Sequence, residues 1–461
     1  MVEPIVIAGS RVFGAPTPCT KYPTARNTRL RAGELDKPGG RAGRSLWAVS
    51  SVVADPPRTL SADVVVIGAG PAGSAAAIAL ARAGRSVIVL DKATFPRDKC
   101  CGDGLTTLAL RELDGLGFDH GAVIDWYDVD RAALRSPSGR EVVVPLPDDG
   151  KYAAVAPRLQ LDDALVELAR KAGADIHDGI AFDGLTTGTD SITVTATGLT
   201  IEARYVVAAD GMWSPTRKAL GAGEAGYLGE WHGFRQYARN VTGPAAEQLY
   251  VWFEPDLTPG YAWSFPLPNG RANIGFGVLR DGERRIQSMK GLWEDLLQRP
   301  HVREALGEQV ELEDRHTAWP IPARVDNIAL TCGRTLFVGD AAAATDVMTG
   351  EGIGQALLTG RLAAEAILGA GAGQPDVASA SYERAVAHHL IADHRMSALL
   401  GRVLSTSWGA RGALRVVASS GDWGRRNFAR WMFEDEPRAI LLTPSRWHRR
   451  MLRQPGAFQS A

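Results

Sequence analysis

The order of apolar and polar residues along the chain predicts a strand, a helix and a second strand between residues 63 and 91. A short apolar run, DVVVIG, precedes a stretch of small residues, PAGSAAAIALARAG, and a second apolar run, RSVIVLD. Apolar runs of this length favour buried strands, and the stretch between them is long enough for a helix. We expect ordered structure to begin at Asp63.

The remaining elements follow from similar patterns. Leu161, Leu165 and Leu168 recur at helical spacing, whereas RANIGFGVL alternates as a strand does. The expected elements are a helix over 157–173, short strands over 175–209, longer antiparallel strands over 231–280, a buried strand at TLFVGD, a helix at EGIGQALLTGRLAAEAIL, and further helices through the last hundred residues.

This order of elements predicts an α/β fold with a Rossmann-like nucleotide-binding domain, an antiparallel-sheet substrate domain and C-terminal helices. Residues 1–60 differ from the rest, because basic residues outnumber acids and no periodicity is sustained; we expect a disordered basic leader. The expected division is a discontinuous nucleotide domain over 61–150, 155–225 and 330–375, a substrate domain over 226–329, and a helical region over 376–461.

Composition narrows the functional classes. The chain has 461 residues with 51 basic and 52 acidic side chains, which argues against nucleic-acid binding through a broad basic face. It contains no apolar run long enough to span a membrane and no secretory signal. Four scattered cysteines favour a reducing cytoplasm. The spacing of His388, His389 and His394 does not favour a metal site, and none is predicted.

The glycines of the first strand–helix turn predict a dinucleotide site. Gly68, Gly70 and Gly73 form G-x-G-x-x-G between a strand and a helix, and Asp91 ends the next strand. The first glycine permits the tight turn, the second lets the backbone approach a pyrophosphate, and the third lets the helix pack on the strand. The helix N-terminus attracts phosphate, and Asp91 can accept hydrogen bonds from a ribose.

Two later segments indicate which dinucleotide binds. Asp210-Gly211 and Gly339-Asp340 each end a strand, and Gly350, Gly352 and Gly354 open a helix after Asp340. With the glycine turn, this set resembles the flavoprotein hydroxylase superfamily typified by para-hydroxybenzoate hydroxylase. The resemblance implies FAD, with Asp340 at the ribitol, the Gly350–Gly354 backbone beside the flavin ring, Asp210 near the pyrophosphate and Arg158 near the cofactor. The predicted cofactor-binding residues are Gly68, Gly70, Gly73, Asp91, Lys92, Arg158, Asp210, Gly211, Gly339, Asp340, Gly350, Gly352, Ile353 and Gly354.

The stretch YAWSFPLPNGRANIGFG, residues 261–277, indicates a hairpin with one aromatic face. Tyr261, Trp263 and Phe265 point the same way on a strand, because side chains alternate. We expect Pro266 and Pro268 to end that strand and Asn269-Gly270 to form the turn. Gly275 and Gly277 then leave room above the returning strand.

This pattern resembles the Y-x-W-x-F-P and G-x-G signature of the geranylgeranyl reductase family, and FPRDKCCGDGLT at 95–106 resembles that family's cysteine segment. The similarity runs from about 61 to 370 and looks closest to bacterial menaquinone reductases. It implies reduction of a prenyl double bond, with Cys101, Tyr261 and Trp263 as catalytic residues and Phe265, Gly275 and Gly277 at the substrate. Two departures are Val347, where the family commonly has proline, and Cys100, which doubles the expected cysteine.

Each of these site residues has a structural alternative. The three aromatics wall an apolar tunnel whose π faces ease positive charge at a prenyl carbon, or they are ordinary sheet core. Cys101 is a site residue or a small residue packed beside the flavin. Lys99 positions phosphate or substrate, or is a solvated charge.

The C-terminal segment bears on the substrate's source. Residues 401–461 carry eleven arginines and four acids, together with Trp408, Trp423, Trp431 and Trp447. This composition suits peripheral contact with an anionic membrane, and the alternative is a helical cap with inward tryptophans.

Three functions remain open at this point. The first is an FAD-dependent reductase of prenyl lipids, the second a flavin monooxygenase or halogenase acting on an aromatic or polyketide-like compound, and the third a flavin-binding protein without chemistry. No second dinucleotide motif is present, so the electron donor, NAD(P)H or a ferredoxin, is undetermined.

Overall fold

The computed structural model describes residues 58–280, 286–451 and 453–459, so the expected leader lies almost entirely outside the described residues. Strand β1, Arg58–Ile67, begins before the expected Asp63. Its extra residues pair in parallel with β11, Leu199–Ala208, and Arg58 lies opposite Leu199. The early start therefore has a physical reason, because a long partner strand supplies hydrogen bonds that a sequence pattern does not reveal.

The first sheet is the mainly parallel sheet of the nucleotide-binding region. Its order is β17-β18-β11-β1-β2-β8, and an antiparallel extension of β10 and β9 leaves from β11. The further strands of this sheet are β2 (Val87–Asp91), β8 (Asp175–Asp178), β9 (Phe182–Thr187), β10 (Ile192–Ala196), β17 (Thr331–Cys332) and β18 (Thr335–Phe337). The glycine turn after β1 and the Gly339-Asp340 turn after β18 both lie at the carboxyl edge of this sheet, where ligands of open α/β sheets bind.

The second sheet has seven strands in the order β16-β12-β15-β14-β13-β5-β6. Its strands are β5 (Arg131–Arg135), β6 (Glu141–Pro145), β12 (Trp231–Arg239), β13 (Leu249–Trp252), β14 (Gly260–Leu267), β15 (Arg271–Leu279) and β16 (Glu311–Ile321). A three-stranded sheet of β3 (Gly104–Leu105), β7 (Ala154–Val155) and β4 (Tyr127–Asp128) completes the strands.

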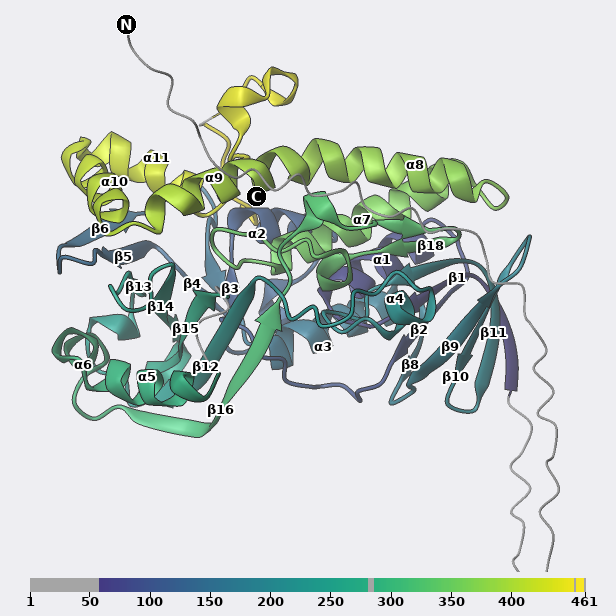
Figure 1. Ribbon diagram of the computed structural model, residues 1–461, viewed down its shortest axis with the longest axis horizontal. Coiled ribbons are helices and arrows are strands. Elements are labelled where there is room, and N and C mark those ends of the chain that lie inside the picture. The colour runs from purple at the N-terminus through teal and green to yellow at the C-terminus, as the bar shows by residue number, and fades with distance from the viewer. Residues whose placement is uncertain (1–57, 281–285, 452, 460–461) are drawn as a thin grey trace, which may run out of the picture.

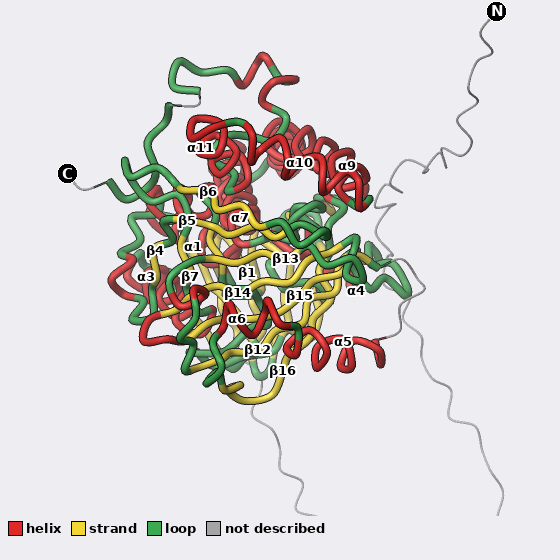
Figure 2. Tube along the Cα trace, turned by 90° about the vertical axis from the view of Figure 1, so that its left-hand side faces the viewer, coloured by secondary structure: helices red, strands yellow, loops and turns green. Residues whose placement is uncertain are grey.

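The helices lie around these sheets, as Figure 1 shows. The helices α8 to α11 run along one side of the molecule, and α10 and α11 lie against β6 of the second sheet (Figures 1 and 2). The helices are α1 (Pro71–Arg82), α2 (Thr107–Gly115), α3 (Arg158–Lys171), α4 (Pro215–Ala219), α5 (Ile286–Gln298), α6 (Pro300–Leu306), α7 (Ile353–Ala370), α8 (Pro375–Val386), α9 (Ala392–Leu404), α10 (Ser407–Ser419) and α11 (Gly421–Met432).

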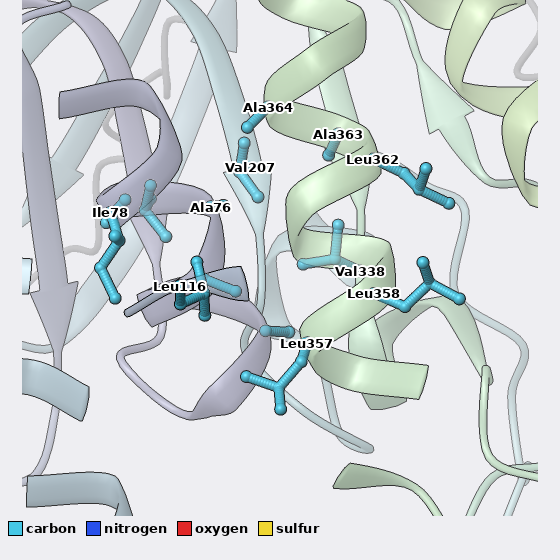
Figure 3. Packing of buried hydrophobic residues seen from close by; sticks show 14 of the residues in the cluster. Ala76, Ile78, Leu116, Val207, Val338, Leu357, Leu358, Leu362, Ala363 and Ala364 are labelled. Atoms are coloured by element: carbon cyan, nitrogen blue, oxygen red, sulfur yellow. The ribbon is translucent and has the colours of Figure 1, made fainter. Parts of the chain in front are cut away.

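The largest core lies between the first sheet and helices α1 and α7. Figure 3 shows Ala76 and Ile78 on one side of this core and Leu357, Leu362 and other α7 residues on the other. The two helices can approach closely because Gly360 of α7 has no side chain. A Cβ at this position would meet the carbonyl oxygen of Ala72 at 2.1 Å. This contact fixes both helix N-termini relative to the sheet edge.

Two expectations about the second sheet are wrong. Strands β5 and β6, which we expected in the nucleotide domain, join the second sheet because β5 pairs in parallel with β13. Pro266 lies inside β14, which continues to Leu267. The hairpin turn forms as expected, with left-handed φ values of 61° at Asn269 and 67° at Gly270.

Candidate active site

A single large cavity connects the edge of the first sheet with one face of the second. Its volume is about 1530 Å³, and its far end is lined by α9, α10 and α11. Most of the predicted site residues line this cavity: Gly68, Gly70, Asp91, Lys92, Cys101, Arg158, Asp210, Gly211, Tyr261, Trp263, Phe265, Gly277, Gly339, Asp340, Gly350, Gly352 and Ile353. Segments from all three parts of the chain therefore meet around one space.

Three predicted glycines lie outside the cavity lining. A Cβ at Gly73 would meet the Gly68 oxygen at 1.8 Å, so this glycine serves helix packing. A Cβ at Gly275 would meet the Trp263 ring at 2.5 Å, so the tryptophan, and not a ligand, fills the space above it. A Cβ at Gly354 would meet the Ala109 nitrogen at 3.0 Å, because α7 packs on α2 there.

The glycine turn after β1 is built to receive a phosphate group. Gly68 has a φ of 101°, and a Cβ there would meet the Ala209 oxygen at 2.3 Å. Gly70 precedes α1, whose N-terminus has no side-chain cap and no acidic residue in its first turn. Asp91 accepts hydrogen bonds from the amides of Ala69, at 2.8 Å, and Ala93, at 2.9 Å. An uncapped helix end facing a cavity fits the pyrophosphate of FAD.

Two arginines beside this turn are held by one buried acid. Arg158 binds Asp162 through two hydrogen bonds of 2.7 Å, and Arg97 reaches the same carboxylate at 2.7 Å. A Cβ at Gly70 would lie 3.5 Å from the Arg97 guanidinium. Arg97 was not among the predicted site residues, although its position in FPRDKCC, shortly after the strand that ends at Asp91, is a usable signal.

Asp210 has a structural task at the cavity edge. Its carboxylate accepts a hydrogen bond from the Ser214 hydroxyl at 2.6 Å and from the Thr216 amide at 2.8 Å. These bonds hold the start of α4, while Gly211, with a φ of 77°, turns the chain. The contribution of Asp210 to a cofactor site is therefore to shape this edge.

The aromatic face of β14 runs through the middle of the cavity. The rings of Tyr261 and Trp263 lie 6.0 Å apart, and those of Trp263 and Phe265 lie 5.9 Å apart. The Tyr261 hydroxyl donates a hydrogen bond to the Thr349 carbonyl, in the loop that contains Gly350. The face thus joins the predicted flavin loop at one end and packs near Gly104 at the other.

A buried polar network lies beside this aromatic face. Asn273 accepts a hydrogen bond from the Trp263 indole at 3.1 Å and donates to the Cys101 carbonyl at 2.9 Å and to Asp103 at 2.8 Å. Asp103 also accepts a hydrogen bond of 2.6 Å from Tyr237. Burial raises the pKa of Asp103 to about 6, against the effect of the hydrogen bonds from Tyr237 and Asn273. The network fixes Trp263 relative to the cysteine segment.

Sequence reasoning missed Asn273 and Asp103. Asn273 has the same strand parity as Gly275 and Gly277, so it faces the aromatic side of the hairpin. A polar residue on that face of an otherwise apolar strand was the available signal. Asp103 lies in the quoted cysteine segment, where its left-handed φ of 64° marks a backbone held by its surroundings.

The two neighbouring cysteines face different groups. Cys101 lies beside Arg158, and burial raises the pKa of its thiol to about 12, so it keeps its proton. Cys100 lies beside Thr317 and Arg235 on the second sheet, and burial also raises its pKa. Lys99 places its ammonium 3.7 Å from the Trp319 ring centre, and burial lowers its pKa. Both cysteines line the cavity, Cys101 beside Arg158 and Cys100 beside Arg235.

The far end of the cavity is apolar. Leu400, Val403, Leu404, Trp408, Ala413 and Val417 from α9 and α10 line it, with Phe428, Trp431 and Met432 from α11. The arginines of this region do not all face solvent, because Arg430 is buried and binds Asp435. Trp431 and Trp408 both line the cavity, but Trp408 is also 73% exposed, and Trp423 is 75% exposed.

Comparison with known sequences identifies the family of this fold. The family model described as FAD binding domain matches residues 61–367. The chain is 37% identical over 333 residues to a menaquinone reductase of Mycobacterium tuberculosis, an alignment that covers 66% of this chain and 76% of the relative. It is 33% identical to a digeranylgeranylglycerophospholipid reductase of Methanopyrus kandleri, over 66% of this chain and 79% of the relative.

Solved structures show the same fold. A protein described as geranylgeranyl bacteriochlorophyll reductase-like, from Thermoplasma acidophilum, has a TM-score of 0.71 at 20% identity, covering 84% of this chain and 100% of its own. A halogenase has a TM-score of 0.64 at 18% identity, covering 81% of this chain and 83% of its own. The chain therefore belongs to the FAD binding domain family, as an FAD-dependent oxidoreductase related to menaquinone and digeranylgeranylglycerophospholipid reductases.

Proposed function

We propose that this protein uses FAD to saturate a carbon–carbon double bond of a prenyl lipid, of the menaquinone side chain or geranylgeranyl type. The observation that carries the proposal is the continuous cavity, which runs from the uncapped N-terminus of α1 past Tyr261, Trp263 and Phe265 to the apolar end at α9–α11. A long apolar chain lying along this path brings one of its double bonds beside the predicted flavin loop.

When bound, reduced FAD supplies a hydride. The residues of this chain then have three tasks in the proposed reaction. Gly68, Gly70 and the α1 N-terminus hold the cofactor phosphates, and the aromatic face excludes water and orients the prenyl chain. The rings of Tyr261 and Trp263 ease any positive charge at the reacting carbon. Cys101 keeps a protonated thiol at this part of the cavity.

The source of the lipid is also a proposal. The outer surface of α9–α11 exposes Leu399, Trp408, Val416 and Trp423, interspersed with exposed Arg402, Arg411, Arg415 and Arg426. Since α9 and α10 also line the cavity, a lipid that leaves an anionic bilayer at this surface enters directly. Among the described residues no helix is long and apolar enough to cross a membrane. We propose that the exposed surface of α9–α11 makes peripheral contact with the membrane, on its cytoplasmic side.

Anaerobic reoxidation tests the proposed function. The purified holoenzyme is reduced with dithionite and mixed with a prenylated quinone or a geranylgeranyl lipid, while flavin absorbance and lipid mass are followed. We expect reoxidation without oxygen and a lipid heavier by two hydrogens. Reoxidation only after air is admitted, with a hydroxylated or halogenated aromatic product, would instead support the monooxygenase or halogenase alternative. The physiological electron donor, NAD(P)H or a ferredoxin, stays a prediction. It is tested by using each of these donors in place of dithionite in the same assay.

A further inference from the structure

A second cavity lies behind the predicted flavin loop. Its volume is about 460 Å³, and unlike the far end of the main cavity it is lined mainly by charged and polar side chains. These include Arg111, Glu112, Asp346, Gln355, Arg361, His388, His389, Asp393, His394, Glu434, Asp435, Glu436, Arg438, Arg446 and His448. In the described part of the chain, no group of three or more His, Cys, Asp or Glu is arranged to hold a metal ion.

Glu434 stands in the wall between the two cavities. Its carboxylate accepts a hydrogen bond of 3.0 Å from the Thr106 hydroxyl, and Thr106 lines the main cavity. It accepts a second bond of 3.0 Å from the Gln355 amide, and Gln355 lines the second cavity. Glu434 has a left-handed φ of 57°, a strained conformation that its surroundings must maintain.

Glu351 presents a second carboxyl on the main-cavity side of the same wall. It lines the main cavity and accepts a hydrogen bond of 2.9 Å from the Ile353 amide at the start of α7. Glu351 lies just before α7, and Glu434 is close enough for its charge to act on the Glu351 carboxyl. Polar groups therefore stand on both sides of this wall, with Glu351 at the main cavity and Glu434 and Gln355 at the second cavity.

Both carboxyls are suited to hold a proton near neutral pH. Burial, and then repulsion from Glu434, raises the pKa of Glu351 to about 8. Burial raises the pKa of Glu434 to about 7, although Arg438 opposes this. Asp346 differs, because Arg438 lowers its pKa despite its burial. Arg438 lies 3.5 Å from Asp346 and 3.4 Å from Glu434, and of these two carboxyls Asp346 has the lowered pKa and Glu434 the raised one.

We propose that Glu434 and Glu351 form a relay that carries protons from the second cavity to the main cavity. This proposal rests on the proposed function, because the relay would supply the proton that reduction of the double bond consumes. Saturation breaks one C=C π bond and forms two C–H bonds, one from the hydride supplied by reduced FAD, which is oxidised, and one from a proton. An apolar tunnel excludes the water that would otherwise provide this proton. The relay releases one proton to the main cavity for each double bond and regains one from solvent that enters the second cavity.

The charged groups around the relay set its pH range. Glu434 is faced by Arg438, Asp346, Glu351, Thr106 and Gln355, and of these only Arg438 favours its ionised form through charge. Glu351 is faced by Glu434 and Asp346, which both favour its protonated form. We therefore expect proton delivery to fall as the pH rises above about 8.

Substitutions at Glu434 test the relay in the holoenzyme. In the anaerobic assay, Glu434→Gln and Glu434→Ala should slow reoxidation by the lipid about 100-fold, the scale of a lost acid catalyst. Formate, a small acid that can enter the second cavity, should restore the Glu434→Ala rate in proportion to its concentration. Glu436→Gln is the matched control, since Glu436 lines the same cavity but binds His448. A wild-type rate in Glu434→Gln, or a slow Glu434→Ala that formate does not restore, would overturn the relay.

Infrared spectroscopy separates the relay from the proposed function, because it needs no lipid. The wild-type holoenzyme should show carbonyl stretching bands of protonated carboxyls that disappear between about pH 7 and pH 8. In Glu434→Gln the remaining Glu351 band should titrate at lower pH, since its neighbouring charge is gone. Absence of these bands at neutral pH overturns the relay. Their presence without lipid turnover in the wild type counts against the proposed function alone.

Discussion

The two ends of the main cavity are made of different parts of the polypeptide. At the nucleotide end part of the wall is the backbone of the glycine turn, where an added Cβ at Gly68 would meet a carbonyl oxygen at 2.3 Å. Gly73, just outside the lining, supports this turn, and an added Cβ there would meet a carbonyl oxygen at 1.8 Å. At the far end the wall is side chains from α9–α11, several of which are also exposed to solvent. A backbone wall fixes the position of a ligand closely, whereas a wall of side chains adapts to chains of different length.

This difference predicts how each end responds to substitution. At the nucleotide end one added methyl group has no space, so its effect is nearly all-or-none. At the far end the loss of one side chain removes only a share of an apolar surface, so effects are graded. The aromatic face lies between the ends and should behave in an intermediate way.

Gly73→Ala should give the largest effect. The added methyl group forces α1 away from β1, at a cost of about 3 kcal/mol or more in the free energy of unfolding, and disrupts the phosphate site. We expect loss of bound flavin, measured by absorbance after purification, and a lower midpoint of denaturant unfolding. Gly291→Ala is the matched control, because nothing lies within 4 Å of that exposed helical position and alanine stabilises helices by about 1 kcal/mol. A Gly73→Ala protein that retains flavin with an unchanged midpoint would contradict the comparison.

The nucleotide end was also the part that the sequence predicted most completely. Its glycine spacing, strand–helix–strand order and terminal acid are local in sequence, so a short window contains the geometry. The resemblance to the flavoprotein hydroxylases implied that Gly354 lies beside the flavin, because a glycine needed for contact between α7 and α2 looks identical in sequence to one needed for ligand contact. Sequence alone does not say which neighbour a glycine approaches.

Trp263 should give the next largest effect. Its ring lies in the middle of the aromatic face and its indole N–H is bound to Asn273. We expect Trp263→Phe to keep the fold and to slow lipid-dependent flavin reoxidation about 100-fold, because it replaces the indole with a smaller and weaker π face and removes the hydrogen bond that orients the ring.

Trp293→Phe is a closely matched control for this variant. Trp293 is equally buried, and its indole donates a hydrogen bond of 3.1 Å to Gln236, but it packs on Phe234 and Phe276 away from the cavity. Both variants should lose similar stability in thermal unfolding, and only Trp263→Phe should lose turnover. Equal turnover in the two variants would show that the aromatic face is ordinary sheet core without a role in the reaction.

The hairpin also shows where sequence reasoning stopped. Strand alternation correctly placed Tyr261, Trp263 and Phe265 together, because that rule is local. The partners of the hairpin come from distant segments, and Asp103 and Tyr237 reach Asn273 only after folding. Long-range pairing also explains why β5 and β6 were assigned to the wrong sheet, since nothing within residues 131–145 specifies β13 as a partner.

The buried Asp103 predicts a smaller effect that depends on pH. Its pKa in the folded protein is about 6, above the ordinary value of 3.8. Between about pH 4 and pH 6 the Asp103 carboxyl is therefore protonated in the folded protein and ionised in the unfolded chain. Stability from this group is complete below about pH 4 and is lost as the pH rises through about 6, on the order of 3 kcal/mol in all. Asp103→Asn, which suits the left-handed backbone, should remove this slope in denaturant unfolding measured from pH 4 to pH 7. An identical slope in both proteins would show that Asp103 is ionised throughout.

The smallest effects belong to the exposed surface of α9–α11. Trp408→Ser and Trp423→Ser together should weaken binding to phosphatidylglycerol vesicles about tenfold, because lost burial of about 1.4 kcal/mol corresponds to that factor. Leu312→Ser is the control: Leu312 is also exposed, but it lies on β16, at the opposite edge of the second sheet from β6 and its helices. Binding is measured by vesicle sedimentation at low and high salt, since the arginine contribution is screened and the tryptophan contribution is not. Equal losses of vesicle binding in both variants would contradict the proposal that lipid enters at α9–α11. Salt-sensitive binding that survives the tryptophan substitutions would show that the arginines alone bind the vesicles.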